Sequence, residues 1–495
     1  MDLITVYSVY ITIALLLAIG VVAAIVTSVA IGRRWSALSL PMILTLLIAG
    51  GAVGVLVSGR NLSGDFSIVV AMLESGASSR WVNRGFITLI VVLCIGIIVG
   101  WMINRQRAPL AGTSLFVGFL LYYITMSLLP SIFGTKPAFL HNQIYPLLVM
   151  VAIFLSDRPT PEHFNAFAKW LLFAFIVASV ITAVVDPNLA LELNYHGWIP
   201  GFNLRLWGLA SHANVLGPVA LTLLMLEYMQ PTRNSLLRVV LILVTFSALV
   251  LTQSKTTWLA GLIVMSFLVA YRKVPEFARA LRGRGQVPLS SVFYLGSLLL
   301  VLLALAAVLL TVNTDRLIDN LMASDVGAGL ETASGRKLIW ETALQEWKNN
   351  WLFGYGPLVW GDVYRFQHGM FTYAFHAHNQ VLQSVSMGGG FALFGLLAYV
   401  WLLWRYSIRA ASATRGVSVA LLLLALIRSM SEVPFPQHAV FSMDFHLHIV
   451  MVMVLLLNGS PLRSRHVRVH QGSGLPGSNA LPVSVGGGFG TALKR

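Results

Sequence analysis

Two histidines and an amide stand together in the segment FHAHNQ, directly before a long apolar run. The unperturbed pKa of an imidazole lies near 6.5, so the neutral form of His378 can accept a proton at ordinary pH. His376 is the second candidate for such a base, and Asn379 can orient the base or a sugar. The segment therefore predicts a general base at the start of the apolar run.

Isolated cations stand in three further polar segments: Arg205 in NLRLWG, Lys255 in TQSKTT and Arg336 in SGR. Arginine can hold phosphate oxygens through two parallel N–H groups, whereas lysine acts as a compact point charge. His212 and Asn214 follow Arg205 and add polar groups. No carboxylate pair of the kind that glycosidases use is evident in these segments. The set favours an anionic substrate such as a lipid diphosphate.

The composition decides what kind of chain must position these residues. Hydrophobic residues make up 57% of the sequence and charged residues 10%, which is typical of a polytopic membrane protein and not of a soluble domain. We expect an all-α integral membrane protein with about 12–14 transmembrane helices. The predicted spans are 3–31, 38–58, 86–104, 110–133, 140–156, 167–186, 208–228, 235–252, 256–271, 289–312, 382–404, 416–433 and 443–457.

One long polar stretch organises the chain. Residues 1–312 are predicted to hold transmembrane helices 1–10, residues 313–381 to form a periplasmic loop region, and residues 382–457 to hold the last spans. Within the loop, Ser334 and Gly335 are expected to cap a short amphipathic helix that ends before the GYGP turn. Residues 458–495 are basic, then rich in Gly and Ser, and are predicted to be a disordered cytoplasmic tail.

The formal net charge of +15 reports topology and not a nucleic-acid partner. When the loops alternate from an external N-terminus, one side receives most of the basic residues. The only acids on that side are Asp157, Glu162, Glu227 and Glu276. By the positive-inside rule this side is cytoplasmic. FHAHNQ and the loop before it are therefore predicted to lie outside the cytoplasm.

Each candidate also has a simpler interpretation. Arg205 and Arg336 can be interfacial residues that reach lipid headgroups, and Lys255 can anchor a turn. A histidine beside a span is often an interfacial hydrogen-bonding group, and the His-x-His spacing also allows a metal site, although the sequence offers no third ligand at a convincing spacing. The remaining simple interpretations are helix capping by His212 and Asn214 and an ion pair between Arg428 and Glu432, one helical turn apart.

The order of these segments resembles the O-antigen ligase and polymerase superfamily of bacterial envelope glycosyltransferases. The resemblance is carried by RLWGLASHANVLG, LTQSKTTWLAG, SGRKLIWETALQEWKNNWLFGYGP and HAHNQVLQSVSMGGG, which together cover most of residues 200–400. Two departures stand out: Lys255 occupies a position where the family usually has arginine, and Ala392 interrupts the usual glycine spacing. These departures affect contact geometry and not the class of reaction.

The resemblance implies transfer of a glycan from undecaprenyl diphosphate to a sugar hydroxyl of lipid A-core, at the periplasmic face of the inner membrane, without metal or other cofactor and with inversion. His378 is then the base, and Arg336 and Lys255 act with Arg205 on the diphosphate. Asn379, His376, His212 and Asn214 are assigned to substrate binding. The expected partners are the donor, the acceptor and membrane lipids, with no nucleic acid.

The same residues also suit three other functions. An O-antigen polymerase uses the same donor, and a protein O-oligosaccharyltransferase would differ in its acceptor. A transporter or flippase for lipid diphosphates could use the same cations without cleaving a bond, although no internal repeat of the transporter kind is evident.

Overall fold

The computed structural model describes residues 38–63, 77–103, 112–193, 202–281, 327–370 and 374–459, together with isolated positions before and between them. These residues belong to one structural unit, Met1–Ser460. The predicted spans 3–31 and 289–312 lie mostly or wholly outside the described residues, as does nearly all of the predicted tail.

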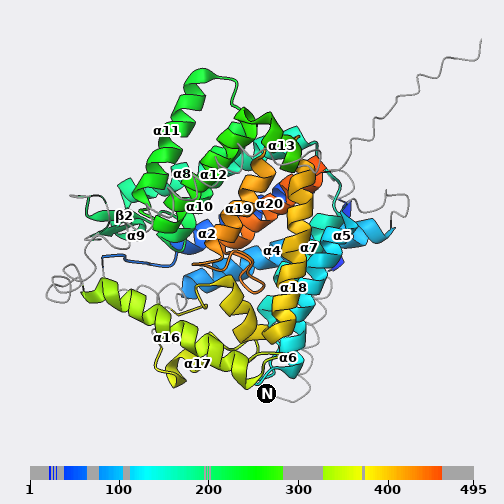
Figure 1. Cartoon of the computed structure of the whole chain (residues 1–495), viewed down its shortest axis with the longest axis vertical. Coiled ribbons are helices and arrows are strands. Elements are labelled where there is room, and N and C mark those ends of the chain that lie inside the picture. Colours follow the sequence, from blue (N-terminus) through cyan, green and yellow to red (C-terminus); the bar gives the residue numbers. More distant parts are fainter. Residues whose placement is uncertain are drawn as a thin grey trace, which may run out of the picture. The chain divides into compact units, whose positions relative to one another are not determined.

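The described chain is almost entirely helical (Figure 1). The helices are α2 (Ser39–Leu56), α4 (Ala77–Ile103), α5 (Thr113–Tyr123), η2 (Ile124–Leu128), α6 (Leu129–Phe133), η3 (His141–Gln143), α7 (Ile144–Leu155), α8 (Pro161–Val185), α9 (Pro187–Ala190), α10 (Ala213–Met229), α11 (Ser235–Leu251), α12 (Lys255–Lys273), α13 (Pro275–Leu281), α16 (Gly327–Asn349), α17 (Asp362–Gln367), α18 (Gln380–Ala410), α19 (Val417–Arg428) and α20 (Met443–Gly459). The two strands, β1 (Leu191–Leu193) and β2 (Leu204–Leu206), form one antiparallel hairpin.

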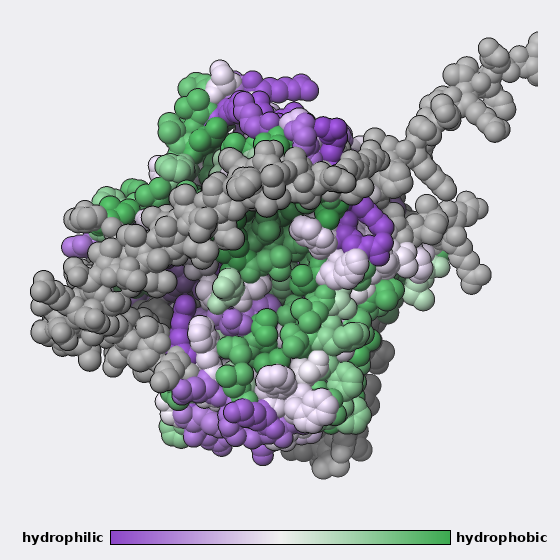
Figure 2. Space-filling model, viewed as in Figure 1, coloured by the Kyte–Doolittle hydropathy of each residue, from purple (hydrophilic) through white to green (hydrophobic). Residues whose placement is uncertain are grey.

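The predicted membrane class is confirmed by the length and apolar character of the helices. Among the described residues, five helical segments are long and apolar enough to cross a membrane: Ser39–Leu56, Ser79–Ile103, Thr113–Phe133, Pro161–Val185 and Gln380–Ala410. The other predicted spans within the described chain coincide with the somewhat shorter helices α7, α10, α11, α19 and α20, and with α12. Figure 2 shows hydrophobic side chains over the middle of one face, with hydrophilic side chains gathered over α16 and α17.

Several helix ends that are far apart in the sequence lie together at one end of the helices. The first residues of four helices lie close to the last residues of two others: α10, α12, α18 and α20 begin where α11 and α19 end. Short contacts join these ends. The hydroxyl of Ser431 donates to that of Thr256 at 3.2 Å, and the amide of Gln380 donates to the carbonyl of Ser429 at 2.8 Å. We name this the site end. The other end holds a buried ion pair in which Lys169 Nζ lies 2.9 Å from Glu227 Oε2.

A buried arginine holds the loop that leads into the site end. The guanidinium of Arg60 donates to the carbonyls of Leu189, Ala210 and Gly208 at 2.8, 2.7 and 2.6 Å. It also lies over the ring of Trp207, at 5.6 Å from the ring centroid. Because these carbonyls flank the β1–β2 hairpin on both sides, Arg60 fixes the path of the backbone that carries Arg205.

The long loop is fastened to α18 where that helix is interrupted. Gly389 has a φ of 64°, and the carbonyls freed by the kink accept hydrogen bonds from the GYGP turn: Tyr355 donates to Ser386 at 2.8 Å and Gly356 to Met387 at 3.0 Å. A side chain at Gly389 would overlap the backbone of Leu352. Helix α16 is thereby held against α18, as Figure 1 shows.

The predicted start of the loop helix was wrong. Helix α16 begins at Gly327, so Ser334 and Gly335 lie inside it and do not cap it. The apolar face was predicted correctly in part, because Ile339 and Ala343 are fully buried. Packing of these residues stabilises a helix that continues through Gly335 despite the low helix propensity of glycine.

Candidate active site

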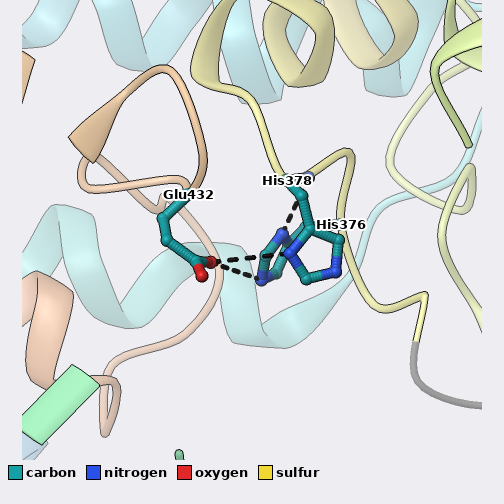
Figure 3. Close-up of side chains that lie close together, drawn as sticks. All are labelled: His376, His378 and Glu432. Carbon is teal, nitrogen blue, oxygen red and sulfur yellow. Dashed lines mark hydrogen bonds and ion pairs between the residues drawn. The ribbon is translucent and has the colours of Figure 1, made fainter. Parts of the chain in front are cut away.

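The side chains of His376, His378 and Glu432 point toward one another at the site end (Figure 3). Glu432 Oε2 lies 3.7 Å from His376 Nε2 and 3.6 Å from His378 Nδ1. The histidines come from the turn before α18, and the glutamate follows α19. Only 9% of Glu432 is exposed, so its carboxylate must be stabilised by polar and charged groups around it.

One hydrogen bond defines the tautomer of His376. The backbone amide of His378 donates to His376 Nδ1 at 3.1 Å. Nδ1 is therefore the acceptor, and in the neutral ring Nε2 carries the proton and faces Glu432. The three groups also lie within 4.8 Å of one another, a spacing that a metal ion accepts. A metal ion at Nε2 would need a deprotonated nitrogen there, so this hydrogen bond favours an N–H of a neutral ring that faces the carboxylate over a metal ligand.

Burial and charge set the ionisation of the cluster. Burial lowers the pKa of His376 to about 3, and the charge of His378 acts in the same direction, while Glu432 opposes them. For Glu432, burial alone would raise the carboxyl pKa, but His378, His376 and Arg428 together hold that pKa below its ordinary value. A neutral His376 therefore lies beside an ionised Glu432.

Arg205 reaches this cluster through one amide. Its Nη2 donates to Asn214 Oδ1 at 2.6 Å, and Asn214 Nδ2 donates to Glu432 Oε1 at 3.2 Å. Arg205 Nε donates to the carbonyl of Thr252 at 2.8 Å, and the guanidinium lies over the ring of Tyr195. Arg205 thus brings a positive charge to the site and also ties β2 to the TQSKTT turn.

The TQSKTT turn lies beside Arg205, with Thr252, Gln253, Ser254 and Thr257 buried and Lys255 exposed. Gln253 has a φ of 46° and its amide donates to the carbonyls of Phe202 and Leu204 at 3.1 and 2.7 Å. Lys255 belongs to this segment and is the first residue of α12. It lies close enough to Arg205 for their charges to interact. The backbone of the turn before α18 is strained in the same way, because His378 also has a positive φ, of 47°.

A histidine caps one helix at the site end and an asparagine caps another. His212 Nδ1 accepts the amide of Asn214 at 3.0 Å and caps α10. Asn379 Oδ1 accepts the amides of Val381 and Leu382 at 2.9 and 3.1 Å and caps α18. Capping therefore accounts for His212 and for the carbonyl of Asn379. Contacts of either residue with a sugar stay predictions.

Arg336 lies on α16, close enough to His376 for its charge to act on that imidazole. The position of α16 is fixed nearby, because Trp340 Nε1 donates to the carbonyl of Ala377 at 3.0 Å. The structure thus brings Arg336, Arg205, Lys255 and the two histidines to one end of the helices.

The predicted ion pair between Arg428 and Glu432 was wrong. Arg428 pairs with Asp444 on α20 and donates to the carbonyl of Asn214 at 3.2 Å. The helical spacing itself persists, because the backbone amide of Glu432 donates to the carbonyl of Arg428 at 2.8 Å, but the guanidinium of Arg428 is taken by Asp444. Sequence reasoning missed Glu432 as a member of the site because its partners lie far away in the chain. Its one signal was an acid beside a span.

The fold and this cluster define a multi-pass membrane protein that gathers cations, imidazoles and a carboxylate at one end of its helices. Residues 239–397 match the family model of O-antigen ligase, which confirms the predicted resemblance to the O-antigen ligase and polymerase superfamily. The match supports glycosyltransferase activity of that type, on lipid-linked glycan and lipid A-core types of substrate. It includes Lys255 and His378 and ends before Glu432. No curated protein matches the chain.

Proposed function

We propose that this protein is an O-antigen ligase that transfers a glycan from undecaprenyl diphosphate to a sugar hydroxyl of lipid A-core at the periplasmic face of the inner membrane. The observation that carries the proposal is the convergence of Arg205, Lys255, Arg336 and His378 from four separate segments. Each cation suits the donor diphosphate, and the imidazole suits the acceptor hydroxyl.

In the proposed reaction, His378 takes the proton of the acceptor hydroxyl as its oxygen attacks the anomeric carbon of the donor sugar. A new glycosidic bond forms, the bond between that carbon and the phosphate oxygen breaks, and undecaprenyl diphosphate leaves with the electron pair. Direct displacement inverts the anomeric centre. The proton then leaves His378 for solvent.

The cations act on the leaving group. Negative charge grows on the diphosphate as the bond breaks, so Lys255, Arg336 and Arg205 stabilise the transition state more than the bound donor. Two nitrogens of Arg205 are already engaged by protein groups, and Nη1 is the nitrogen for which the described residues offer no hydrogen bond. The side chain of Arg336 has no hydrogen bond to another described residue and lies close enough to His376 for its charge to act there, so it is the better candidate for a forked phosphate contact.

His378 is a better base than His376. Nδ1 of His376 accepts a backbone amide and its Nε2 faces Glu432, so both nitrogens are engaged. In His378 only Nδ1 faces the carboxylate, and Nε2 has no hydrogen bond to a described residue. That nitrogen is available to a hydroxyl group.

Reconstitution tests the function. Purified protein in proteoliposomes with lipid-linked O-antigen and lipid A-core should yield joined product on gels, with no ATP or nucleotide sugar. Donor alone should yield none. Elongated lipid-linked glycan from donor alone would identify a polymerase, and movement of donor across the bilayer with no new bond would reject a transferase.

A further inference from the structure

Glu432 is an unusual residue at a buried position, because a buried carboxylate is stable only where donors surround it. Its two oxygens have separate surroundings. Oε1 accepts the amide of Asn214 at 3.2 Å, and Oε2 faces the rings of His376 and His378 at 3.7 and 3.6 Å (Figure 3). Helix capping or packing would not require two imidazoles on one oxygen.

The position of the carboxylate selects one tautomer of His378. Nδ1 of this ring is fully buried and finds no other partner within hydrogen-bonding distance. A proton on Nδ1 is favoured because it faces the negative oxygen, and Nε2 is then left with its lone pair. The opposite tautomer would turn a lone pair toward the carboxylate.

We infer that Glu432 is a positioning residue that holds His378 with its proton on Nδ1, so that Nε2 is the basic atom, and that it stabilises the imidazolium formed when Nε2 takes the acceptor proton. This inference rests on the proposed function. The arrangement follows the general logic in which a base is oriented by a third group.

Asn214 extends this arrangement to the donor side of the site. Its Oδ1 accepts from a cation and its Nδ2 donates to an anion, so both neighbours demand the same orientation of the amide. Arg205 and Glu432 are thus held on opposite sides of one side chain. A donor that draws Arg205 toward its phosphates therefore acts, through Asn214, on the group that orients the base.

Several charged groups surround Glu432 and contribute to the field at His378. Those whose charges interact with this carboxylate or with its histidine partners are His212, Arg336, His376, Arg428, His438 and Asp444, and Arg205 acts on His212. Because Arg428 is paired with Asp444, Glu432 is the carboxylate that faces His378. A change at Glu432 therefore alters the charge at the base more directly than a change at Asp444.

The first test compares Glu432→Gln with the wild-type chain in the reconstituted reaction. Loss of the charge should lower kcat about a hundredfold or more, with the donor KM changed by less than about threefold. Glu432→Asp keeps the charge and should recover part of the rate. A purely structural role would lower the melting temperature and leave the pH profile in place.

The second test measures the protonation of His378 and does not depend on glycan transfer. Diethyl pyrocarbonate modifies the unprotonated imidazole, and mass spectrometry follows modification of His378 against pH. A carboxylate neighbour favours the protonated ring, so Glu432→Gln should lower the midpoint by about one pH unit. Glu346→Gln is the matched control, because Glu346 is a buried carboxylate that faces His368 at 3.8 Å and should leave this midpoint unchanged.

The two tests separate the possible failures. If wild-type protein moves no glycan but Glu432→Gln shifts the midpoint, the proposed function fails and the coupling of Glu432 to His378 stands. If the wild-type chain transfers glycan and Glu432→Gln matches it in kcat and midpoint, the inference is overturned and the proposed function stands. If Glu432→Gln does not fold, Glu432→Asp provides the test: a partly recovered rate and a midpoint for His378 near that of wild type support the inference, and a rate and midpoint equal to wild type in every respect contradict it.

Discussion

Arg428 at the end of α19 pairs with Asp444 on α20, and this leaves the carboxylate of Glu432 to the two histidines of the HAH motif. The partner of Glu432 determines what this carboxylate can do. An arginine bound to Glu432 would neutralise it, whereas an imidazole beside it gains basicity. The predictions below follow from this cluster and from the loop that supports it.

Replacement of His378 by Asn should abolish transfer while the protein stays folded. Asparagine tolerates a positive φ better than most residues, so it suits the φ of 47° at this position. We expect a loss of turnover of at least about a hundredfold. His163→Asn, at the other end of the helices, is the control. Turnover within about twofold of wild type in the His378 variant would remove this residue as the base.

Replacement of Arg60 by Ala should destabilise the protein and weaken donor use together. Three carbonyls would lose a charged donor in a buried site, at a cost of about 3 kcal/mol. Thermal melting in detergent and the donor KM measure the two effects. Arg84→Ala, which removes an exposed arginine stacked on Trp81, should change neither. An unchanged melting temperature in the Arg60 variant would contradict the role given to that residue.

Acid should destabilise the wild-type chain more than the variant His376→Asn. Burial lowers the pKa of His376 to about 3, whereas the unfolded value is near 6.5. Between these values the unfolded chain binds a proton that the folded chain does not, so stability falls as the pH drops from about 6.5 toward 3. Asparagine removes this contribution and can still accept the amide of His378. Melting temperatures at pH 7 and pH 5 measure the difference, and equal losses in both proteins would refute the assignment.

Chelation of metal ions should leave transfer unchanged. The amide bonded to His376 Nδ1 keeps the proton of the neutral ring on Nε2, which favours an N–H facing Glu432 over a metal site. The rate in the reconstituted reaction should be equal with and without EDTA. A loss of activity that added Zn²⁺ restores would instead make His376, His378 and Glu432 the ligands of a metal ion.

Much of the fold follows from local patterns in the sequence. Apolar runs of sufficient length predict helices such as α8 and α18, although α8 begins at Pro161, before the predicted start of its span at residue 167. Thr160 caps α8 and Asn379 caps α18, as their residue types allow. The start of α16 was mispredicted because a Ser-Gly pair that is typical of a cap lies within a helix stabilised by packing.

The sequence by itself determined the membrane class, the loop before α18 and the types of group available for chemistry, since all of these depend on residues close together in the chain. Only the tertiary structure decided which partners meet. Glu432 lies beside His378, and Asn214 lies between Arg205 and Glu432, because antiparallel helices bring distant segment ends together. Pairing of charges depends on distance in space and on burial, and neither can be read from spacing along the chain.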